Sequence, residues 1–561
     1  MDMDNYNEYR KHTYKDAGVE KGFTTKALIS ILALILALAL TLTSCGASAQ
    51  GSGSTVTADT AVTAEAADNA VSKSEMFTER DLSGDYDESE AETITLNGSS
   101  AETSAASGVT VSGSTVTITE EGVYILSGTL TDGQIIVDAA EEAKVQIVLD
   151  NASVTSSDSA ALYVKSADKV FVTSAAGTEN SLANGGSFTA DGDTNIDGAV
   201  YAKDDITFNG SGSLTITSPA GHGVVGNDDV KFAGGTYVIT AASHGVKAND
   251  SARFAESDVT ITSGSDKDGV HVSDSDVEDA AESESFFYIA DGTLTISASD
   301  DGIHADAAVI IEGGTIVINE SYEGIEGLSI SISGGSTTVT ASDDGLNAAG
   351  GNASSGSQTF GSDDWFGGGM MTEGGTDGSI VISGGYVHIT AGGDGVDSNG
   401  SVEISGGYTV VEGPSQGDTS VLDYNGTAVI TGGTFIGTGG AGMAENFSSA
   451  SQGLITVSVG NQSAGSSVTL KNGAGDVIAE TTPELDYAVV YISTEDMVQG
   501  EAYTLTAGSW SETVTLTDTI YNTVNGGMTG SGLGGGGPRG GVNDPQQGGM
   551  PQGAPGGAPG N

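Results

Sequence analysis

Acidic residues followed by glycine and an aliphatic residue recur along the middle of the chain. Asp301, Glu323 and Asp344 begin three such steps at nearly equal spacing. Asp268 and Asp394 hold the same place in neighbouring copies of the pattern. A period of roughly 20 residues is typical of a solenoid, in which each repeat forms one coil and equivalent residues stack. Because stacked strands lie about 4.8 Å apart, these carboxylates are predicted to form a closely spaced column.

A second polar position follows three residues after each acidic one. Its members are His271, His304, Glu326, Asn347 and Asp397. Two unit charges about 4.8 Å apart repel by on the order of 3 kcal/mol at an effective dielectric constant of about 20. No Lys or Arg occurs from residue 268 to residue 470, so no basic side chain of this span offsets the repulsion.

A bound cation would relieve this repulsion, and the ligand types point to Ca²⁺, which takes about six to eight oxygen ligands and is the usual extracellular choice. We therefore predict Ca²⁺ as a cofactor. The predicted ligands are Asp268, Asp300, Asp301, Asp306, Glu323, Glu326, Asp343, Asp344, Asn347, Asp394, Asp397 and Asn399. The alternative is that these residues only form turns, for which Asp-Gly is a common pair.

Several other side chains could contact a sugar. The predicted carbohydrate-binding residues are His271, His304, Trp365, Phe366, Asp423 and Tyr424. Trp365 and Phe366 could stack on sugar rings, or they could pack back on the solenoid. The two histidines could bind a metal or a sugar, or they could be solvated members of a polar column.

Two enzyme classes are less well supported by the residues. His222 follows the Asp204-Asp205 pair, an order similar to that in inverting polygalacturonases, which use paired carboxylates. The Arg-x-Lys clamp of that family is missing, however, and the glycines around His222 are those of a coil corner. A pectate-lyase mechanism needs a strong base, usually Arg, beside calcium, and the predicted solenoid contains only Arg253. We predict no catalytic residue.

Short strands and glycine corners must position all these side chains. Residues 196–440 repeat an acidic or His residue, Gly and an aliphatic residue, then an alternating strand and Gly-Gly, in about 21 to 24 residues per coil. This length is too short for a propeller blade, and no helical periodicity occurs after the N-terminal segment. An all-β fold built as a parallel β-helix is predicted. Its inward columns are predicted to be Val224, Val246, Val270, Ile303, Ile325, Leu346 and Val396, and Phe232, Ile311, Ile332, Ile382 and Ile404.

The flanking segments differ in composition. Residues 93–195 alternate irregularly and are predicted to form an N-terminal β cap continuous with the solenoid. A Gly-rich insertion covers residues 350–378. Residues 441–520 are predicted to form a small C-terminal β domain, with Lys471-Asn472-Gly473 at a hairpin turn. The Gly-, Pro- and Gln-rich residues 521–561 are predicted to be a disordered tail.

The N-terminus has the pattern of an export signal. Basic residues precede an apolar run over residues 27–42, and Leu42-Thr43-Ser44-Cys45 resembles the bacterial lipobox. We predict a lipoprotein signal peptide over residues 1–44 and lipid on Cys45. A plain membrane anchor is the alternative. Residues 45–92, rich in Ser, Thr, Ala and acids, are predicted to be a disordered spacer.

The net charge of −59 restricts the partners further. Phosphate contacts require Lys and Arg, so a nucleic-acid partner is excluded, and charge-driven adsorption to an anionic membrane is disfavoured. The single Cys also excludes internal disulfides. We expect a monomer on the extracellular face of a bacterial membrane.

Four segments together resemble the signature blocks of a bacterial family of lipid-anchored carbohydrate-binding domain-containing proteins, common in clostridia and their relatives. They are residues 321–327, 342–350, 393–400 and 422–426, and the similarity covers roughly residues 93–520. The resemblance implies a pectate-lyase-like, right-handed β-helix that binds calcium and plant cell-wall polysaccharide, either cellulose or polygalacturonate, without an established catalytic activity. It places Glu323, Glu326, Asp343, Asp344, Asn347, Asp394 and Asp397 on the most acidic face.

The predicted function is therefore calcium-dependent binding of polysaccharide at the cell surface. An acidic face would need calcium to bridge it to an acidic polymer, whereas a neutral glucan would need aromatic side chains, which form only 6% of the chain. A pectin-degrading enzyme and a structural or adhesive surface protein are the alternatives.

Overall fold

The structure is a computed structural model that describes residues 72–274, 277, 283–348, 378–414 and 419–524. The predicted signal, Cys45, most of the Gly-rich insertion with Trp365 and Phe366, and most of the C-terminal tail lie outside the described residues. Among the described residues, no helix is long and apolar enough to cross a membrane.

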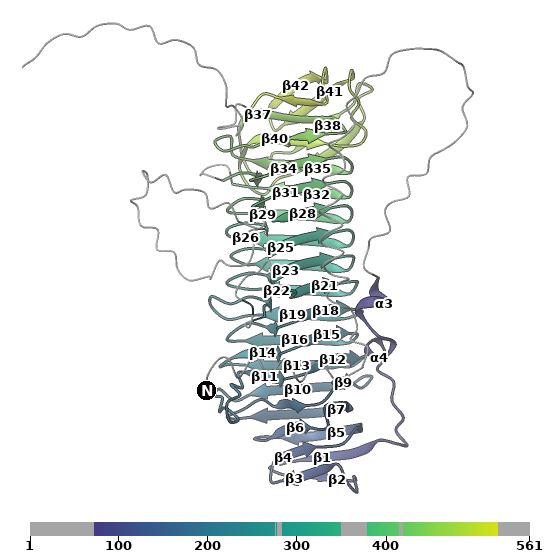
Figure 1. The fold of residues 1–561 in the computed structure, drawn as a ribbon. Coiled ribbons are helices and arrows are strands. Elements are labelled where there is room, and N and C mark those ends of the chain that lie inside the picture. Colours follow the sequence, from purple (N-terminus) through teal and green to yellow (C-terminus); the bar gives the residue numbers. More distant parts are fainter. Residues whose placement is uncertain (1–71, 275–276, 278–282, 349–377, 415–418, 525–561) are drawn as a thin grey trace, which may run out of the picture. The chain divides into compact units, whose positions relative to one another are not determined.

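Parallel strands dominate the chain, and most pair with the strand three positions later in the sequence (Figure 1). They fall into three rows, where a row is a set of strands that pair with one another from one coil to the next. The first row contains β4 (Thr115–Ile118), β6 (Gln134–Asp138), β8 (Leu162–Ser166), β11 (Gly198–Ala202), β14 (His222–Gly226), β17 (Val246–Ala248), β20 (Val270–Val272), β23 (Ile303–Ile311), β25 (Ile325–Ile332), β27 (Leu346–Ala348), β30 (Val396–Ser398) and β33 (Leu422–Tyr424).

The second row contains β5 (Gly122–Leu130), β7 (Lys144–Ser156), β9 (Lys169–Ser174), β12 (Asp205–Gly210), β15 (Asp229–Ala233), β18 (Ser251–Ala255), β21 (Phe286–Ile289), the second halves of β23 and β25, β28 (Ser379–Ile382), β31 (Ser401–Ile404), β34 (Thr427–Ile430) and β36 (Ser449–Ala450). The third contains the end of β7, β10 (Glu179–Asn184), β13 (Ser213–Ser218), β16 (Thr236–Ala241), β19 (Asp258–Thr262), β22 (Thr293–Ser297), β24 (Thr315–Glu320), β26 (Ser336–Ala341), β29 (Tyr386–Ala391), β32 (Tyr408–Glu412) and β35 (Thr434–Gly439).

The predicted inward columns are present and form the core between the rows. Val270, Ile303 and Ile325 pair in register on successive coils, and each is fully buried. In the second row, Phe208, Phe232 and Phe254 stack with ring centroids 4.9 Å and 5.2 Å apart. The second glycine of the Gly-Gly corners takes the left-handed conformation that only glycine adopts without strain; in Gly335 and Gly385 φ is 75° and 79°. The prediction of a β-rich chain dominated by parallel pairing is confirmed, whereas the β-helix form and its hand stay predictions.

Parallel pairing begins before the region for which we expected the regular solenoid. β1 (Glu92–Gly98) pairs parallel with β5 and antiparallel with β2 (Ala101–Thr103), and β3 (Val109–Ser112) forms an antiparallel pair with β4. The antiparallel pairs therefore lie at the N-terminal end of the sheet, and coils of the same pattern already occupy residues 122–195.

Antiparallel strands also follow the last coils. β40 (Tyr487–Ser493) pairs with β35 and with β37 (Leu454–Gln462), which in turn pairs with β43 (Ile520–Asn522). A separate antiparallel sheet contains β39 (Val477–Thr481), β38 (Val468–Lys471), β41 (Ala502–Ala507) and β42 (Trp510–Thr515). Side chains of both groups, including Val457, Val490 and Leu505, share one core. Because β43 pairs with β37, the first residues of the predicted disordered tail belong to this ordered part.

The prediction of a disordered spacer over residues 45–92 is wrong for its last part. Residues 72–91 form two short helices, α3 (Lys73–Met76) and α4 (Glu79–Leu82), and the turn before β1 (Figure 1). Met76 and Phe77 are buried against the second row, on Phe286 and Tyr288. The few apolar residues of the segment do not form a core of their own, but they cover apolar side chains that the coils leave on their outer surface. Residues 45–71 lie outside the described residues.

Candidate functional site

The first row of strands carries two adjacent columns of polar side chains. In each coil, one of these residues lies two positions before the inward aliphatic residue, and the other lies one position after it. We call the first set the first column and the second set the second column. The first column is His222, His244, Asp268, Asp301, Glu323, Asp344 and Asp394. The second column is Lys247, His271, His304, Glu326, Asn347, Asp397 and Asp423. The predicted register is thus present, and both columns change from basic or neutral side chains to acidic ones along the chain.

The central members of the columns are more buried than the side chains of a solvated polar face. Asp301 and His304 are 7% and 9% exposed, and Glu326 is 5% exposed. The coils on either side contribute to this burial, because β23 pairs with both β20 and β25. The alternative that His304 is a solvated histidine therefore does not hold, whereas the ring of His271 remains partly exposed. Such burial makes unbalanced charge costly.

Four histidine rings stack across the two columns. The ring centroids of His222 and His244 are 5.1 Å apart, those of His244 and His271 4.4 Å, and those of His271 and His304 4.9 Å. Burial lowers the pKa of His222 to about 3 and lowers that of His244 from its usual value. Two members of the stack are therefore neutral at physiological pH, and the backbone N–H of Asp268 donates to Nδ1 of His244 at 3.0 Å.

His304 has the most acidic environment of the four histidines. Its Nδ1 lies 2.6 Å from Oε2 of Glu326 and 3.3 Å from Oδ2 of Asp301, and its Nε2 lies 3.3 Å from Oδ1 of Asp306. Burial alone would lower the pKa of His304, but the hydrogen bonds with Asp301, Asp306 and Glu326 raise it well above its usual value. Burial raises the pKa of Asp301, one of the three carboxylates around this imidazole, well above its usual value.

A second acidic group, lined by oxygen atoms alone, lies further along the columns. Burial and the neighbouring acids raise the pKa of Glu323 to about 8 and those of Asp344 and Asp397 to about 7. Burial likewise raises the pKa of Asp394 to about 6. The shifts have a common physical cause, because buried carboxylates that lack a cation resist ionisation.

Local geometry brings these carboxylates together at the turn before β30. The backbone N–H of Asp394 donates to Oδ1 of Asp344 at 2.6 Å, and that of Ser420 donates to Oδ1 of Asp394. Gly393 lies directly beneath, and a Cβ there would collide with Oδ1 of both Asp343 and Asp344. The glycine therefore leaves room for two carboxylates to converge over the turn.

Asn347 connects the two acidic groups. Its Nδ2 donates to Oε2 of Glu323 at 2.7 Å, while its buried Oδ1 has no hydrogen-bond partner among the residues that the structure describes. Asn347 is 6% exposed and follows Glu326 directly in the second column. A buried acceptor without a donor costs free energy unless a water or a cation satisfies it. The residues of this group fit a hard cation, because carboxylate and amide oxygens are the ligands that Ca²⁺ prefers.

The other predicted site residues lie in different settings. Asp268, Asp300 and Asp301 each offer an oxygen to one small cluster, in which the ligand atoms lie within 4.8 Å of one another. Asp423, which was predicted to bind carbohydrate, ends the second column. Asn399 lies further out and accepts from Asn425 at 2.9 Å. The hydroxyl of Tyr424 donates to the Asn446 carbonyl at 2.7 Å, and its ring packs against the core. Trp365 and Phe366 lie outside the described residues.

Sequence reasoning did not assign a site role to His244 or Lys247, which extend the columns toward the N-terminus. The signal was present, because His244 precedes Gly-Val just as Asp268 does. The burial of the columns and the ring stack depend on contacts between coils, which no single repeat reveals.

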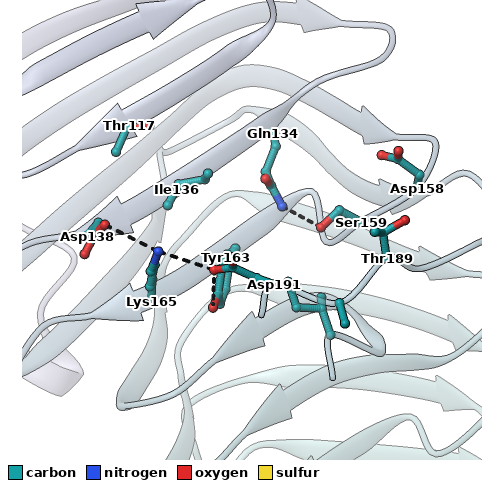
Figure 2. A pocket seen from close by; sticks show the side chains of 12 residues that line it. Thr117, Gln134, Ile136, Asp138, Asp158, Ser159, Tyr163, Lys165, Thr189 and Asp191 are labelled. Atoms are coloured by element: carbon teal, nitrogen blue, oxygen red, sulfur yellow. Dashed lines mark hydrogen bonds and ion pairs between the residues drawn. The ribbon is translucent and has the colours of Figure 1, made fainter. Parts of the chain in front are cut away.

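A pocket near the N-terminal coils was also missed (Figure 2). It has a volume of about 450 Å³ and is lined by side chains of β4, β6 and β8 and of the turns at residues 158–159 and 189–196. Nζ of Lys165 lies 3.3 Å from Asp191 and 3.8 Å from Asp138. Ile136 and Tyr163, which line it, hold the register position of the second column on earlier coils.

In comparisons with known proteins, part of the chain is similar to carbohydrate-binding domain-containing proteins. Residues 112–363 match the model of a family described as "Carbohydrate-binding domain-containing protein". A protein of the same description from Acetivibrio thermocellus is 37% identical over 134 residues, which are 24% of this chain and 47% of the relative. The chain thus spans about half the length of that relative.

A solved structure is also similar, described as "Structure of the polysaccharide lyase-like protein from C. thermocellum, Gadolinium derivative". It is 29% identical, covers 44% of this chain and 93% of its own, and has a TM-score of 0.38. The family match, which ends at residue 363, includes both columns up to Asn347.

Proposed function

We propose that this chain binds a plant cell-wall polysaccharide, polygalacturonate or cellulose, on the face formed by the two columns, without cleaving it. The observation that carries the proposal is the buried group of oxygen ligands around Asn347, whose Oδ1 has no hydrogen-bond partner within the described part of the chain. The family match over residues 112–363 supports carbohydrate as the partner.

Ca²⁺ is the proposed cofactor of this face. Glu323, Asn347, Asp344, Asp394 and Asp397 would hold it, with Asp343 and Asp423 beside them. Bound there, the ion would supply the positive charge that offsets carboxylate repulsion and would bridge an acidic polymer to an acidic surface. The residues themselves position the ligand atoms, because each is fixed by its place on a stacked strand or turn.

The form of the coils, the membrane anchor and the location of the protein belong to the same proposal. The coils would form a right-handed parallel β-helix, and lipid on Cys45 would anchor a monomer at the extracellular face of a bacterial membrane. This placement is consistent with the strongly negative charge and with the single Cys of the chain.

Co-sedimentation of the full chain with insoluble polygalacturonate and with cellulose tests the function. We expect binding with Ca²⁺, loss of binding with excess chelator, and recovery when Ca²⁺ is restored. The Asp344→Asn/Asp397→Asn double variant should bind at least about tenfold more weakly, since each change removes a charged ligand. Asp476→Asn, in an exposed turn of the C-terminal sheet, is the matched control and should bind normally.

Two results would overturn the proposal. Absence of binding to both polymers would leave a structural or adhesive surface protein as the better explanation. Shortening of the polymer during incubation would instead indicate an enzyme.

A further inference from the structure

The ligands around His304 differ in chemical type from those around Asn347. Ca²⁺ binds oxygen atoms, whereas an imidazole nitrogen is a common ligand of zinc-class ions. His304 presents Nδ1 to two carboxylates, Asp301 and Glu326, which reach it from the first and second columns. The three ligand atoms lie within 4.8 Å of one another, and all three residues are buried.

We propose that Asp301, His304 and Glu326 form a separate site for a first-row transition dication of the zinc class. The site lies on the same face as the proposed calcium group, but the inference goes beyond glycan binding and does not depend on it. We had expected these three residues to bind Ca²⁺ or sugar. In the present proposal they form a metal site with both nitrogen and oxygen ligands.

The distances suit such an ion. Bonds of about 2.0–2.1 Å in a tetrahedron place ligand atoms ~3.3 Å apart. Nδ1 of His304 is 3.3 Å from Oδ2 of Asp301, so this pair needs no rearrangement. The 2.6 Å separation of Nδ1 and Oε2 of Glu326 is a hydrogen-bond distance, and it would open by about 0.7 Å, to ~3.3 Å, when an ion replaces the proton.

Asp306 acts as a positioning residue behind the imidazole. Its Oδ1 lies 3.3 Å from Nε2 of His304, on the side of the ring opposite the two ligand carboxylates. A carboxylate that accepts the second N–H of a metal-binding His fixes its tautomer and orientation, and makes the other nitrogen a better donor. Asp306 is 7% exposed, so little water competes for this contact.

Two further observations point to an ion at this place. His304 and its three neighbouring carboxylates are all buried, so a bound dication would satisfy ligand atoms that water reaches poorly. Asn347 follows Glu326 by one coil in the second column, and among the described residues its buried Oδ1 has no hydrogen-bond partner. His388 offers a contrast, because in the described part of the chain its Nε2 lies near a single carboxylate, that of Glu412 at 3.1 Å, on a strand outside the columns.

Metal binding by the full chain tests the proposal. Zn²⁺ alone, added in the presence of excess Ca²⁺, should remain bound after dialysis, and Co²⁺ in its place should give the visible absorption bands of nitrogen and carboxylate ligation. His304→Gln should lose Zn²⁺ and the Co²⁺ bands but keep its Ca²⁺ stoichiometry, because His304 is not one of the proposed calcium ligands. His388→Gln is the matched control and should retain both.

The variant of the positioning residue gives an independent readout. Asp306→Asn should lower Zn²⁺ affinity about 10- to 100-fold while the Co²⁺ bands persist at saturating metal, since the ligands themselves remain. Displacement of Zn²⁺ from the wild-type protein by equimolar Ca²⁺ would overturn the proposal, and so would unchanged Zn²⁺ binding in a folded His304→Gln. Neither result would alter co-sedimentation with polysaccharide, which is a separate measurement and tests the proposed function.

Discussion

At the scale of single residues, Gly393 occupies a position where any larger residue would displace two predicted ligands. Its Cβ would meet Oδ1 of Asp343 and of Asp344, and its backbone N–H donates to the Asp343 carbonyl at 2.8 Å. Glycine is therefore needed here because the neighbouring carboxylates leave no room for a side chain, and not because the backbone is left-handed.

Gly393→Ala is expected to weaken Ca²⁺ binding about tenfold with the fold retained, because the methyl group pushes the two carboxylates apart. Isothermal titration of the full chain with Ca²⁺ measures the change. Gly473→Ala is the control, since its Cβ would have only an ordinary 3.7 Å contact, with the Ala502 carbonyl. Equal Ca²⁺ affinity in the two variants would exclude the Gly393 turn from the calcium site.

At the scale of elements, the segment with α3 and α4 ties several coils together from outside. Thr78 caps α4, and its N–H and hydroxyl donate to Oδ2 of Asp81 at 2.9 Å and 2.8 Å. The other oxygen of Asp81 accepts from Nζ of Lys169 at 2.7 Å and from the hydroxyl of Thr207 at 2.8 Å. One fully buried carboxylate thus caps a helix and joins it to two strands, β9 and β12.

Loss of the Asp81 charge is expected to detach this segment. Asp81→Asn leaves the buried ammonium of Lys169 without its closest carboxylate, which should cost about 3 kcal/mol. Hydrogen exchange of residues 72–83 should therefore accelerate, while exchange in the core strands changes little. Glu79→Gln, an exposed change in the same helix, should have no effect. Equal protection of residues 72–83 from hydrogen exchange in the two variants would contradict the anchoring role of Asp81.

The pH dependence of the segment follows from the same carboxylate. Burial raises the pKa of Asp81, but Lys169 and Lys231 outweigh burial and hold it well below the usual 3.8. Since the folded pKa is the lower one, the stabilisation is complete above pH 3.8 and is lost as the pH falls through the folded pKa. The difference in exchange between wild type and Asp81→Asn should persist at pH 5 and shrink only at more acidic pH.

At the scale of the whole molecule, carboxylates concentrated on one row of strands oppose the stacking that buries them. Stability in a solenoid is approximately a sum over neighbouring coils, so repulsion between adjacent coils acts on the entire stack. Cations bound only by the folded stack should therefore stabilise it as a unit.

Added Ca²⁺ is expected to raise the thermal midpoint of the metal-free chain. The gain should be about 2.7 kcal/mol when the free ion is at 100 times its dissociation constant. Scanning calorimetry at constant ionic strength measures the shift, with Mg²⁺ as the comparison, because Mg²⁺ dehydrates reluctantly and needs near-octahedral ligands. Equal shifts with both ions would indicate general charge screening instead of a calcium site.

The sequence by itself determined the repeat, the inward columns and the identity of both polar columns, because a regular period puts equivalent side chains in register wherever strands stack in parallel. It could not determine how deeply those side chains are buried, since burial depends on the neighbouring coils. It also mistook residues 72–91 for spacer, because Met76, Phe77 and Asp81 have partners only on distant strands.

The two proposed metal sites on the acidic face are distinguished by tertiary structure alone. In the sequence, His304 and Asn347 are equivalent members of one polar column. In the fold, His304 contacts Asp306 and two further carboxylates, whereas Asn347 donates to Glu323 and its Oδ1 has no partner among the described residues. The physical reason is that register fixes which residues are neighbours, but only the packing of strands and turns fixes which atoms of those neighbours converge.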